Sequence, residues 1–287
     1  MEIIKTIKTI SEVRRITAAW KQEGLSIGFV PTMGYLHEGH QSLIERAASE
    51  NDRVVASVFV NPLQFGPTED FSSYPRDLER DMTVCRSAGA HMIFHPEAGE
   101  MYFPDFCTYV DMDSLTEGLC GKSRPGHFRG VCTVVLKLFN IVGADRAYFG
   151  EKDAQQLAVI RRMVRDLSMG VEIVGCPIIR EKDGLAKSSR NTYLSPTERE
   201  AALILKKSLD AGRKLANQGE RNAKKIVDTI RENLMTEPLA RLDYVELVDA
   251  LTMEKVEAVD RQVLVAVAAY VGKTRLIDNF FFEPEQA

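Results

Sequence analysis

Short apolar runs alternate with amphipathic segments along the first two-thirds of the chain. We predict strands where the apolar runs lie, at residues 26–30, 53–60, 91–95, 145–150 and 171–180. Helices are predicted between them, where apolar side chains recur three and four positions apart, at residues 11–24, 40–50, 76–90, 130–143 and 152–167. The first helix should begin with Ser11 as its N-cap and end at Gly24. Strands that alternate with helices predict βαβ units and an α/β fold with a parallel sheet.

The pattern changes after about residue 180, where strands and helices no longer alternate. Ser195 and Glu198 have the spacing of a capping box, and Pro196 takes the first helical position, so a long helix should follow through residue 212. A second helix is predicted over residues 222–235. Three extended segments follow, at residues 242–249, 263–271 and 274–282. We therefore predict a first domain over residues 1–180 and a smaller α+β domain over residues 181–287.

The composition is that of an ordinary globular protein and narrows the choice of partners. Of 287 residues, 45% are apolar, and the net charge of −4 argues against a nucleic-acid partner, because a phosphate backbone needs a basic face. Five cysteines, an odd number without a C-x-x-C pair, fit reduced thiols in a cytosolic protein. The N-terminal segment carries charges throughout, which argues against a signal peptide. The longest apolar run, residues 263–271, is shorter than the about 20 residues of a membrane span, so no membrane partner is expected.

The stretch FVPTMGYLHEGHQSLIERA joins a predicted strand to the helix that follows it. His40 falls in the first helical turn and His37 just ahead of it, while Gly34 and Gly39 leave room for a ligand to approach the backbone. The N-terminus of a helix carries unpaired N–H groups and partial positive charge, and parallel sheets bind ligands at the carboxyl ends of their strands. Two imidazoles add hydrogen-bond donors for a reacting phosphate. The stretch therefore indicates a nucleotide phosphate site.

Two other interpretations of the histidine pair stay open at this point. A zinc site is disfavoured because the histidines lie only three positions apart, Glu38 lies between them, and no third ligand is evident nearby. Two histidines in a capped turn without any chemistry fit the spacing as well as a phosphate site does.

Resemblance to known enzymes decides between these interpretations. HEGH resembles the HIGH motif of the nucleotidyltransferase superfamily, which includes the class I aminoacyl-tRNA synthetases. LAKSSRN, at residues 185–191, resembles the KMSKS loop of those enzymes, although taken alone it fits a solvated loop better. Four longer stretches together resemble the pantothenate synthetases (pantoate–β-alanine ligases), at residues 58–81, 124–142, 148–164 and 180–195. The last hundred residues are less diagnostic.

The resemblance implies a Rossmann-like domain over residues 1–180 that binds nucleotide and pantoate. It implies that residues 181–287 carry the KSSR phosphate loop and close over the site. The implied reaction condenses (R)-pantoate with β-alanine to pantothenate through a pantoyl-adenylate intermediate, consuming ATP and releasing AMP and pyrophosphate. Magnesium is expected with ATP, because charge on the phosphates must be neutralised. The family also suggests a cytoplasmic homodimer.

The resemblance further implies roles for individual residues. The catalytic residues it implies are His37, His40 and Lys152. Contacts to ATP are implied for Met33, Gly34, Tyr35, Leu36, His37, Glu38, Gly39, His40, Gly150, Glu151, Lys152, Asp153, Ile179, Lys187, Ser188, Ser189 and Arg190. Contacts to pantoate and β-alanine are implied for Asn61, Gln64 and Gln156, since amides can donate to a carboxylate and accept from a hydroxyl. Asp81 matches a position near the metal.

Two positions depart from the family pattern, and two other functions compete with the main one. Position 154 is Ala where the family often has Tyr, and position 187 is Lys where Met is common; neither change removes a charged partner. One competing function is a nucleotidyltransferase that attaches AMP to a phosphate ester. The other is an RNA-binding relative of the synthetases without catalysis, which the acidic net charge disfavours.

Overall fold

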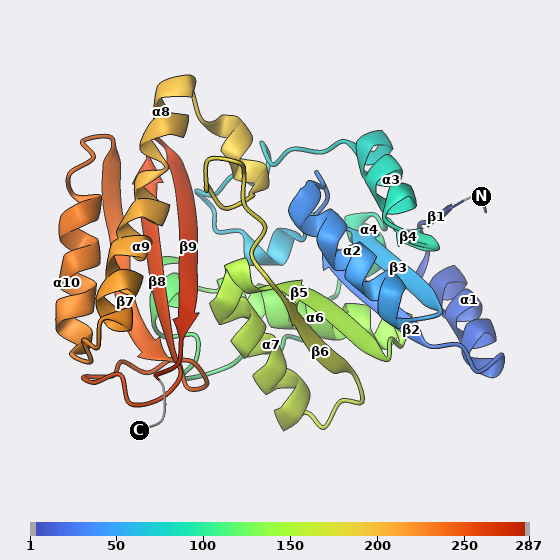
Figure 1. Ribbon diagram of the computed structural model, residues 1–287. Coiled ribbons are helices and arrows are strands. Elements are labelled where there is room, and N and C mark those ends of the chain that lie inside the picture. Colours follow the sequence, from blue (N-terminus) through green and yellow to red (C-terminus); the bar gives the residue numbers. More distant parts are fainter. Residues whose placement is uncertain (1–3, 285–287) are drawn as a thin grey trace. The chain divides into compact units, whose positions relative to one another are not determined.

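The computed structural model describes residues 4–284, and the chain divides into two compact units (Figure 1). The first unit comprises the described residues up to Met112, Arg124–Glu151 and Val159–Pro177. The second comprises Asp113–Ser123, Lys152–Ala158 and the described residues from Ile178 onward. The N-terminal segment, for which we predict no signal peptide, includes residues 1–3, which lie outside the described range.

In the described part of the first unit, six parallel strands form one sheet in the order β1-β4-β3-β2-β5-β6. The strands are β1 (Lys5–Ile7), β2 (Ile27–Thr32), β3 (Arg53–Val58), β4 (Met92–Phe94), β5 (Arg146–Gly150) and β6 (Glu172–Cys176). From β2 the chain adds β3 and β4 on one side, and β5 and β6 are then added on the other. Ligands of such sheets bind where the order reverses, here at the carboxyl ends of β2 and β5. The predicted Rossmann-like parallel sheet is confirmed.

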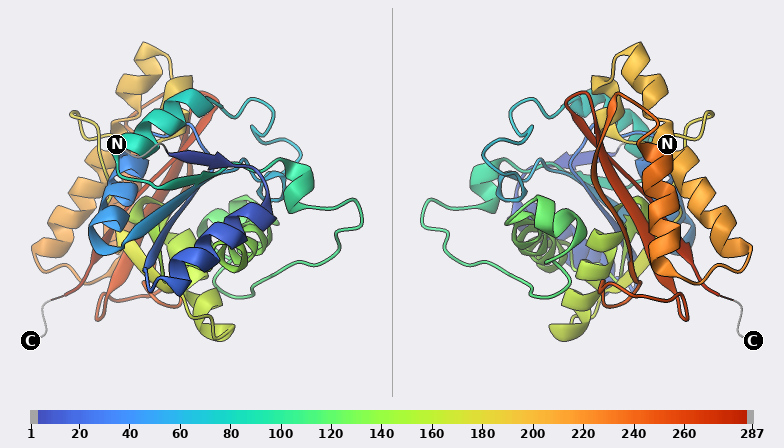
Figure 2. Two further views of the ribbon diagram at one scale, coloured as in Figure 1. Left: turned by 90° about the vertical axis from the view of Figure 1, so that its right-hand side faces the viewer. Right: turned by 90° about the vertical axis from the view of Figure 1, so that its left-hand side faces the viewer.

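Helices cover both faces of this sheet (Figure 2). Successive side chains of a strand point to opposite faces, and because these strands are apolar at nearly every position, both faces must be buried. Val30 and Ile93 belong to a buried cluster that also contains residues of α2 and α3. Phe29 points to the opposite face and meets Phe139 of α6, with ring centroids 6.3 Å apart. The helical elements of this unit are α1 (Ile10–Gln22), α2 (Glu38–Glu50), η1 (Pro62–Gln64), α3 (Leu78–Ser87), α4 (Ala98–Met101) and α6 (His127–Val142). Both faces of the sheet are therefore buried, as in α/β proteins generally.

Some predicted ends of elements differ from the observed ones. Helix α1 begins at Ile10 with Thr9 in the N-cap position, so the predicted N-cap at Ser11 is wrong. Its end is as predicted, since Gly24 follows with a φ of +76°. The predicted helix over 152–167 begins later, because the 3-10 turn η2 (Glu151–Asp153) precedes α7 (Ala154–Asp166).

In the described part of the second unit, three antiparallel strands form a sheet in the order β7-β8-β9. The strands are β7 (Ala240–Asp249), β8 (Val263–Val271) and β9 (Thr274–Phe282). The helical elements are α5 (Leu119–Ser123), η3 (Ser189–Tyr193), α8 (Pro196–Ala201), α9 (Ile204–Asn217) and α10 (Ala223–Leu234). Leu209 of α9 and Ile230 of α10 share a buried cluster with Val265 and Val267 of β8. The predicted α+β organisation is confirmed.

The predicted capping box is present, but the single long helix after it is not. Ser195 is the N-cap of α8, Glu198 closes the box, and Pro196 takes the first helical position. The helix ends at Ala201, and α9 begins at Ile204. Between them Leu203 N donates to the carbonyl of Glu200, a 3-10 type bond that interrupts the α-helical ladder.

Among the described helices, none is long and apolar enough to cross a membrane.

Candidate active site

The turn between β2 and α2 has a backbone that few residues can adopt. Gly34 has a φ of +86° and Tyr35 a φ of +51°. A Cβ atom on Gly34 would lie 2.9 Å from Oδ2 of Asp81 and 2.9 Å from Cγ1 of Val58. A side chain at position 34 is therefore excluded by both the backbone conformation and the space. The glycine lets the turn pass close to β3 and α3 before the chain enters α2.

Asp81 of α3 holds this turn through its backbone amides. Tyr35 N donates to Oδ2 of Asp81 at 3.0 Å and Leu36 N donates to Oδ1 at 2.6 Å, and Asp81 is 1% exposed. Burial raises the pKa of the Asp81 carboxyl, while the two amide hydrogen bonds act in the opposite direction. These contacts make Asp81 an anchor of the turn, and its predicted place near magnesium stays a prediction.

His37 and His40 cap the first turn of α2, at the predicted positions in the chain. Gly39 N donates to Nδ1 of His37 at 3.1 Å, and His37 N donates to Nδ1 of His40 at 3.3 Å. The ring centroids lie 4.1 Å apart. Because Nδ1 of each ring accepts a hydrogen bond, the neutral imidazole carries its proton on Nε2. Both rings thus have an Nε2–H donor at the start of a helix, where anions are favoured.

Gln64 lies beside this turn, at the end of η1. Its Nε2 donates to Sδ of Met33 at 3.2 Å, and its Oε1 accepts from Nδ2 of Asn61 at 3.0 Å. A thioether is a weak acceptor, so a carboxylate or hydroxyl of a ligand is a better partner for the same N–H. The structure thus brings a predicted substrate residue next to the first residue of the predicted ATP turn.

Asn61 is 1% exposed, and its side chain is bonded within the protein. Besides Gln64, its Nδ2 reaches the carbonyl of Gly130 at 3.2 Å. Its Oδ1 accepts from Oη of Tyr102 at 2.7 Å and from Leu63 N at 3.3 Å. These bonds give Asn61 a role in positioning Gln64, and a direct contact with substrate stays a prediction.

Gly130 lets helix α6 approach η1 more closely than any side chain would allow. A Cβ atom there would lie 2.3 Å from the carbonyl oxygen of Leu63 and 2.6 Å from the amide nitrogen of Gln64. Both are backbone atoms, which cannot rotate away as a side chain would. The position of Gln64 therefore depends on a glycine in the neighbouring helix.

A second polar cluster holds the carbonyl of Gln64. Arg124 makes two bonds of 2.7 Å to the carboxylate of Glu69, and its Nη1 donates to Nε2 of His127 at 3.0 Å. Because Nε2 accepts, neutral His127 carries its proton on Nδ1, which donates to the Gln64 carbonyl at 2.9 Å. Burial alone would raise the pKa of Glu69, but the ion pair with Arg124 outweighs it and lowers that pKa. The cluster thus stabilises the position of the η1 turn.

Gly150 and Glu151 lie at the end of β5, which neighbours β2 in the sheet. A Cβ atom built on Gly150 would have no heavy atom within 4 Å, so space is open at this position. These two predicted ATP residues share the carboxyl edge of the sheet with the turn of residues 33–36. They lie where the strand order reverses, which is where α/β sheets bind their ligands.

The second unit contains the remaining predicted residues, beginning with Lys152 and Asp153 of η2. Nζ of Lys152 lies 3.7 Å from Oδ2 of Asp153. The carbonyl of Lys152 accepts from Nδ2 of Asn279 in β9 at 2.8 Å. The lysine is thus fixed through its backbone, while its side chain ends in an ion pair that is easily exchanged for another anion.

The two glutamines of EKDAQQ have different surroundings. Nε2 of Gln155 donates to the carbonyls of Leu115 and Gly118 at 2.9 Å each, and its Oε1 accepts from Cys120 N at 2.9 Å. Gln155 is 6% exposed and holds the segment 113–123 in place. Gln156, the predicted substrate residue, is half-buried, and its contact with substrate stays a prediction.

Residues 178–191 place the predicted adenine and triphosphate contacts side by side. Lys187 N donates to the carbonyl of Ile179 at 2.9 Å. Ser188 is the N-cap of η3 and accepts from Arg190 N at 3.3 Å, while Ser189 is buried. Arg180 and Ala186 also pair in an antiparallel bridge, so residues 179–187 form a short hairpin that carries Ile179. The loop with the two serines begins at the base of this hairpin.

The described residues contain no group of three or more histidine, cysteine, aspartate or glutamate side chains that could hold a metal ion. Magnesium usually keeps several waters and binds one or two carboxylates together with substrate phosphates. Magnesium binding together with ATP therefore stays a prediction.

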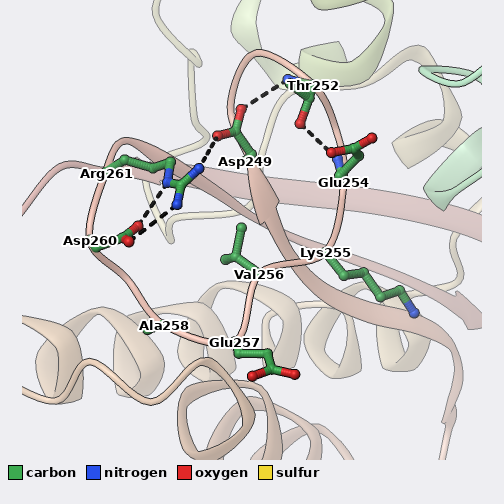
Figure 3. Close-up of a pocket in the computed structure, with 9 residues that line it drawn as sticks. All are labelled: Asp249, Thr252, Glu254, Lys255, Val256, Glu257, Ala258, Asp260 and Arg261. Carbon is green, nitrogen blue, oxygen red and sulfur yellow. Dashed lines mark hydrogen bonds and ion pairs between the residues drawn. The ribbon is translucent and has the colours of Figure 1, made fainter.

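A hollow of about 390 Å³ in the second unit lies in the connection between β7 and β8 (Figure 3). Asp249, which lines it, accepts from Leu251 N at 2.8 Å and Thr252 N at 2.9 Å. Those bonds shape the connection itself, and the described residues that line the hollow include none of the predicted site residues.

The sequence model of the family described as Pantoate-beta-alanine ligase matches residues 5–281. The chain belongs to the pantoate–β-alanine ligase family. A pantothenate synthetase of Enterococcus faecalis is 62% identical over 276 residues, which are 96% of this chain and 98% of that protein. One of Ruminiclostridium cellulolyticum is 60% identical over 98% of this chain and 100% of that protein.

Solved structures of this family share the fold. The crystal structure of pantothenate synthetase from Thermus thermophilus has a TM-score of 0.93 and 49% identity, covering 98% of this chain and 100% of that one. The pantoate–β-alanine ligase of Francisella tularensis, described as complexed with β,γ-ATP and β-alanine, has a TM-score of 0.79 and 35% identity, covering 96% and 97%. The resemblance that the ordered stretches indicate is confirmed.

Proposed function

We propose that this protein condenses (R)-pantoate with β-alanine to pantothenate, using ATP and passing through pantoyl adenylate. Membership of the pantoate–β-alanine ligase family supports this reaction. The observation that carries the proposal is the contact between Gln64 and Met33. It puts an amide suited to a carboxylate or hydroxyl next to the turn that leads to the capping histidines.

The proposed reaction has two steps, and neither needs a covalent nucleophile from the protein. A carboxylate oxygen of pantoate first attacks the α-phosphorus of ATP, and the bond to pyrophosphate breaks. The amine of β-alanine then attacks the acyl carbon of the adenylate, AMP leaves, and the amine gives up a proton. The protein must hold the reactants in line and balance charge on the phosphates.

The donors described above suit that task. Nε2–H groups of His37 and His40 donate to phosphate oxygens at the start of α2, and Lys152 binds the α-phosphate. Gln64 and Gln156 bind pantoate, and Gln64 also contacts β-alanine. The remaining ATP contacts that we propose are Met33, Gly34, Tyr35, Leu36, Glu38, Gly39, Gly150, Glu151, Asp153, Ile179, Lys187, Ser188, Ser189 and Arg190.

We further propose that magnesium enters with ATP and that the protein works as a cytoplasmic homodimer. The first point rests on the chemistry of ATP, because charge on its phosphates must be neutralised. The five free cysteines fit a reducing compartment. The dimer rests on the family resemblance.

Product analysis tests the reaction. The protein is incubated with ATP, magnesium and pantoate, with and without β-alanine, while pyrophosphate is assayed and nucleotides are separated by chromatography. We expect at most a single turnover of pyrophosphate release without β-alanine, and steady release of AMP and pyrophosphate with it. Chelation of magnesium should stop both. Formation of ADP and phosphate, or turnover that needs no β-alanine, would contradict the proposal.

Gln64→Ala should raise the KM for pantoate more than the KM for ATP, because the variant removes the amide that faces the acid substrate. The loss of one hydrogen-bonding side chain predicts an increase of about tenfold for pantoate. Steady-state kinetics with each substrate varied in turn measure the two effects. Gln22→Ala, at an exposed position at the end of α1, is the matched control. Equal changes in both KM values would show that Gln64 has no specific role toward pantoate.

Gly130→Ala, like Gln64→Ala, should raise the KM for pantoate more than the KM for ATP, although residue 130 need not touch substrate. The added methyl group must push η1 away, and a shift of about 1 Å in a substrate-positioning group can cost about 10²-fold in rate. Kinetics with varied pantoate and ATP measure the effect, and Gly170→Ala, where a Cβ atom meets no heavy atom within 4 Å, is the control. Normal pantoate kinetics in Gly130→Ala would show that α6 does not set the position of Gln64.

A further inference from the structure

We propose that strand β9 sets the positions of the ATP-binding segments of the second unit, through the side chains of Asp278 and Asn279. The inference rests on the proposed function, because it takes Lys152 and the loop of residues 187–190 as ATP-binding groups. Asp278 and Asn279 are 2% and 3% exposed, and both are polar residues within an otherwise apolar strand segment. Buried polar side chains are almost always hydrogen-bonded, so the partners of Asp278 and Asn279 identify the segments that these residues hold in place.

Asn279 holds the segment that carries Lys152. Its Nδ2 donates to the carbonyl of Lys152 at 2.8 Å. Lys152 lies in the 3-10 turn η2, ahead of the first residue of α7, so its carbonyl lies outside the regular part of the helix. A side-chain amide from β9 supplies the partner and fixes the backbone from which the lysine side chain extends.

Asp278 holds the hairpin that carries Ile179 and leads into the phosphate loop. Its Oδ2 and Oδ1 accept from Nη1 and Nη2 of Arg180 at 2.7 and 2.8 Å, a bidentate pair. Nη1 of Arg180 also donates to the carbonyl of Gly184 at 3.1 Å, across the hairpin. Because Lys187 N donates to the carbonyl of Ile179, a fixed Arg180 also fixes the start of the loop with residues 187–190.

The two side chains leave β9 on opposite sides. Asp278 is on the side of Leu276 and Phe280, which belong to the buried cluster of this unit, and Asn279 is on the other side. Among the described residues, β9 pairs with β8 alone in this sheet and is an edge strand. The backbone N–H of Asn279 donates to Oδ1 of Asp278 at 2.8 Å, which links the two anchoring residues. One strand thereby fixes the separation between Lys152 and the hairpin.

Asp278 and Asn279 are accordingly positioning residues, and their removal should weaken ATP binding without a specific effect on pantoate. The Asn279→Ala variant should raise the KM and the calorimetric Kd for ATP about tenfold, the effect of one lost hydrogen bond at the upper end of the usual range. The KM for pantoate should change less than about twofold, within the scatter of such measurements. Asn233→Ala, which removes a half-buried amide from α10, is the matched control and should leave both values unchanged.

A double-mutant cycle distinguishes positioning from a general structural effect. If Asn279 acts through the lysine, Asn279→Ala should add little to the loss of ATP affinity in a Lys152→Ala background. Additive losses, or equal changes in the KM values for ATP and pantoate, would overturn the inference. If Lys152→Ala alone leaves ATP binding and adenylation normal, the proposed role of Lys152 fails instead, which separates the two hypotheses.

Asp278→Asn tests the second anchor. It leaves a partly buried guanidinium without its charge partner, so the variant is checked for folding by circular dichroism first. A folded variant should show a raised Kd for ATP, and normal ATP affinity would overturn the role of Asp278. If the variant does not fold, Asp278→Glu tests the same anchor, because it keeps the charge but moves the carboxylate by one methylene. A displaced hairpin again predicts weaker ATP binding, and unchanged ATP affinity would contradict it.

Discussion

Replacing His40 by alanine should slow pantoyl-adenylate formation by about 10²-fold or more, the usual cost of losing a donor to charge that develops in a transition state. In the structure Nδ1 of His40 accepts a backbone hydrogen bond from His37 N, so Nε2 carries the proton in the neutral ring. That N–H is the donor lost in the variant. Single-turnover pyrophosphate release with saturating ATP and pantoate measures the effect on the chemical step.

Two further variants separate the donor from the cap. His40→Asn keeps an acceptor near the position of Nδ1 and loses the outer donor, whereas His40→Gln places an amide N–H near the position of Nε2. If the donor matters, the Gln variant should be faster than the Asn variant. The reverse order would show that His40 acts by capping α2, and near-normal adenylation in all three variants would exclude it from the reaction.

Lys152→Ala should reduce adenylation by a similar factor, about 10²-fold or more, because a fixed cation near the α-phosphate stabilises the charge that builds up as pyrophosphate departs. The ion pair with Asp153 at 3.7 Å is partly exposed, so exchanging it for a phosphate costs little. Folding should be little affected, since the backbone of Lys152 is held by Asn279 and not by its own side chain. Single-turnover kinetics and thermal unfolding measure the two quantities.

The control for charge is Lys182→Ala, an exposed lysine in the same unit, which should leave adenylation unchanged. A general loss of positive charge would affect both variants through long-range attraction of ATP and would fade at high salt. A specific role of Lys152 should persist at high salt. Equal effects of the two substitutions would therefore refute the assignment of Lys152 to the α-phosphate.

The spacing of apolar and polar residues predicts the architecture of each unit, and local motifs indicate where most of the proposed site residues lie along the chain. Alternating apolar and amphipathic segments require a parallel sheet covered by helices, since each apolar face must be buried. The capping pattern around His37 and His40 and the capping box at Ser195 are local, because their donors and acceptors lie within a few residues. Local hydrogen bonds of this kind were predicted correctly at these two helices, whereas the predicted N-cap at Ser11 was wrong because Thr9 takes that position.

The residues that hold the proposed site groups in place are known only from contacts between segments far apart in the chain. The anchors Asp81, Gly130 and Asn279 lie far along the chain from the groups they fix, and the sequence offers only weak signals: a glycine in an apolar helix and a polar pair in an apolar strand. The break between α8 and α9 was not predicted, because the sequence between them has helical spacing throughout. The difference between the two glutamines, with Gln155 bonded to the segment 113–123 and Gln156 half-buried, depends on a fold that brings distant segments together. Periodicity records which side of an element is buried, but the partner that buries it is set by long-range contacts that spacing does not encode.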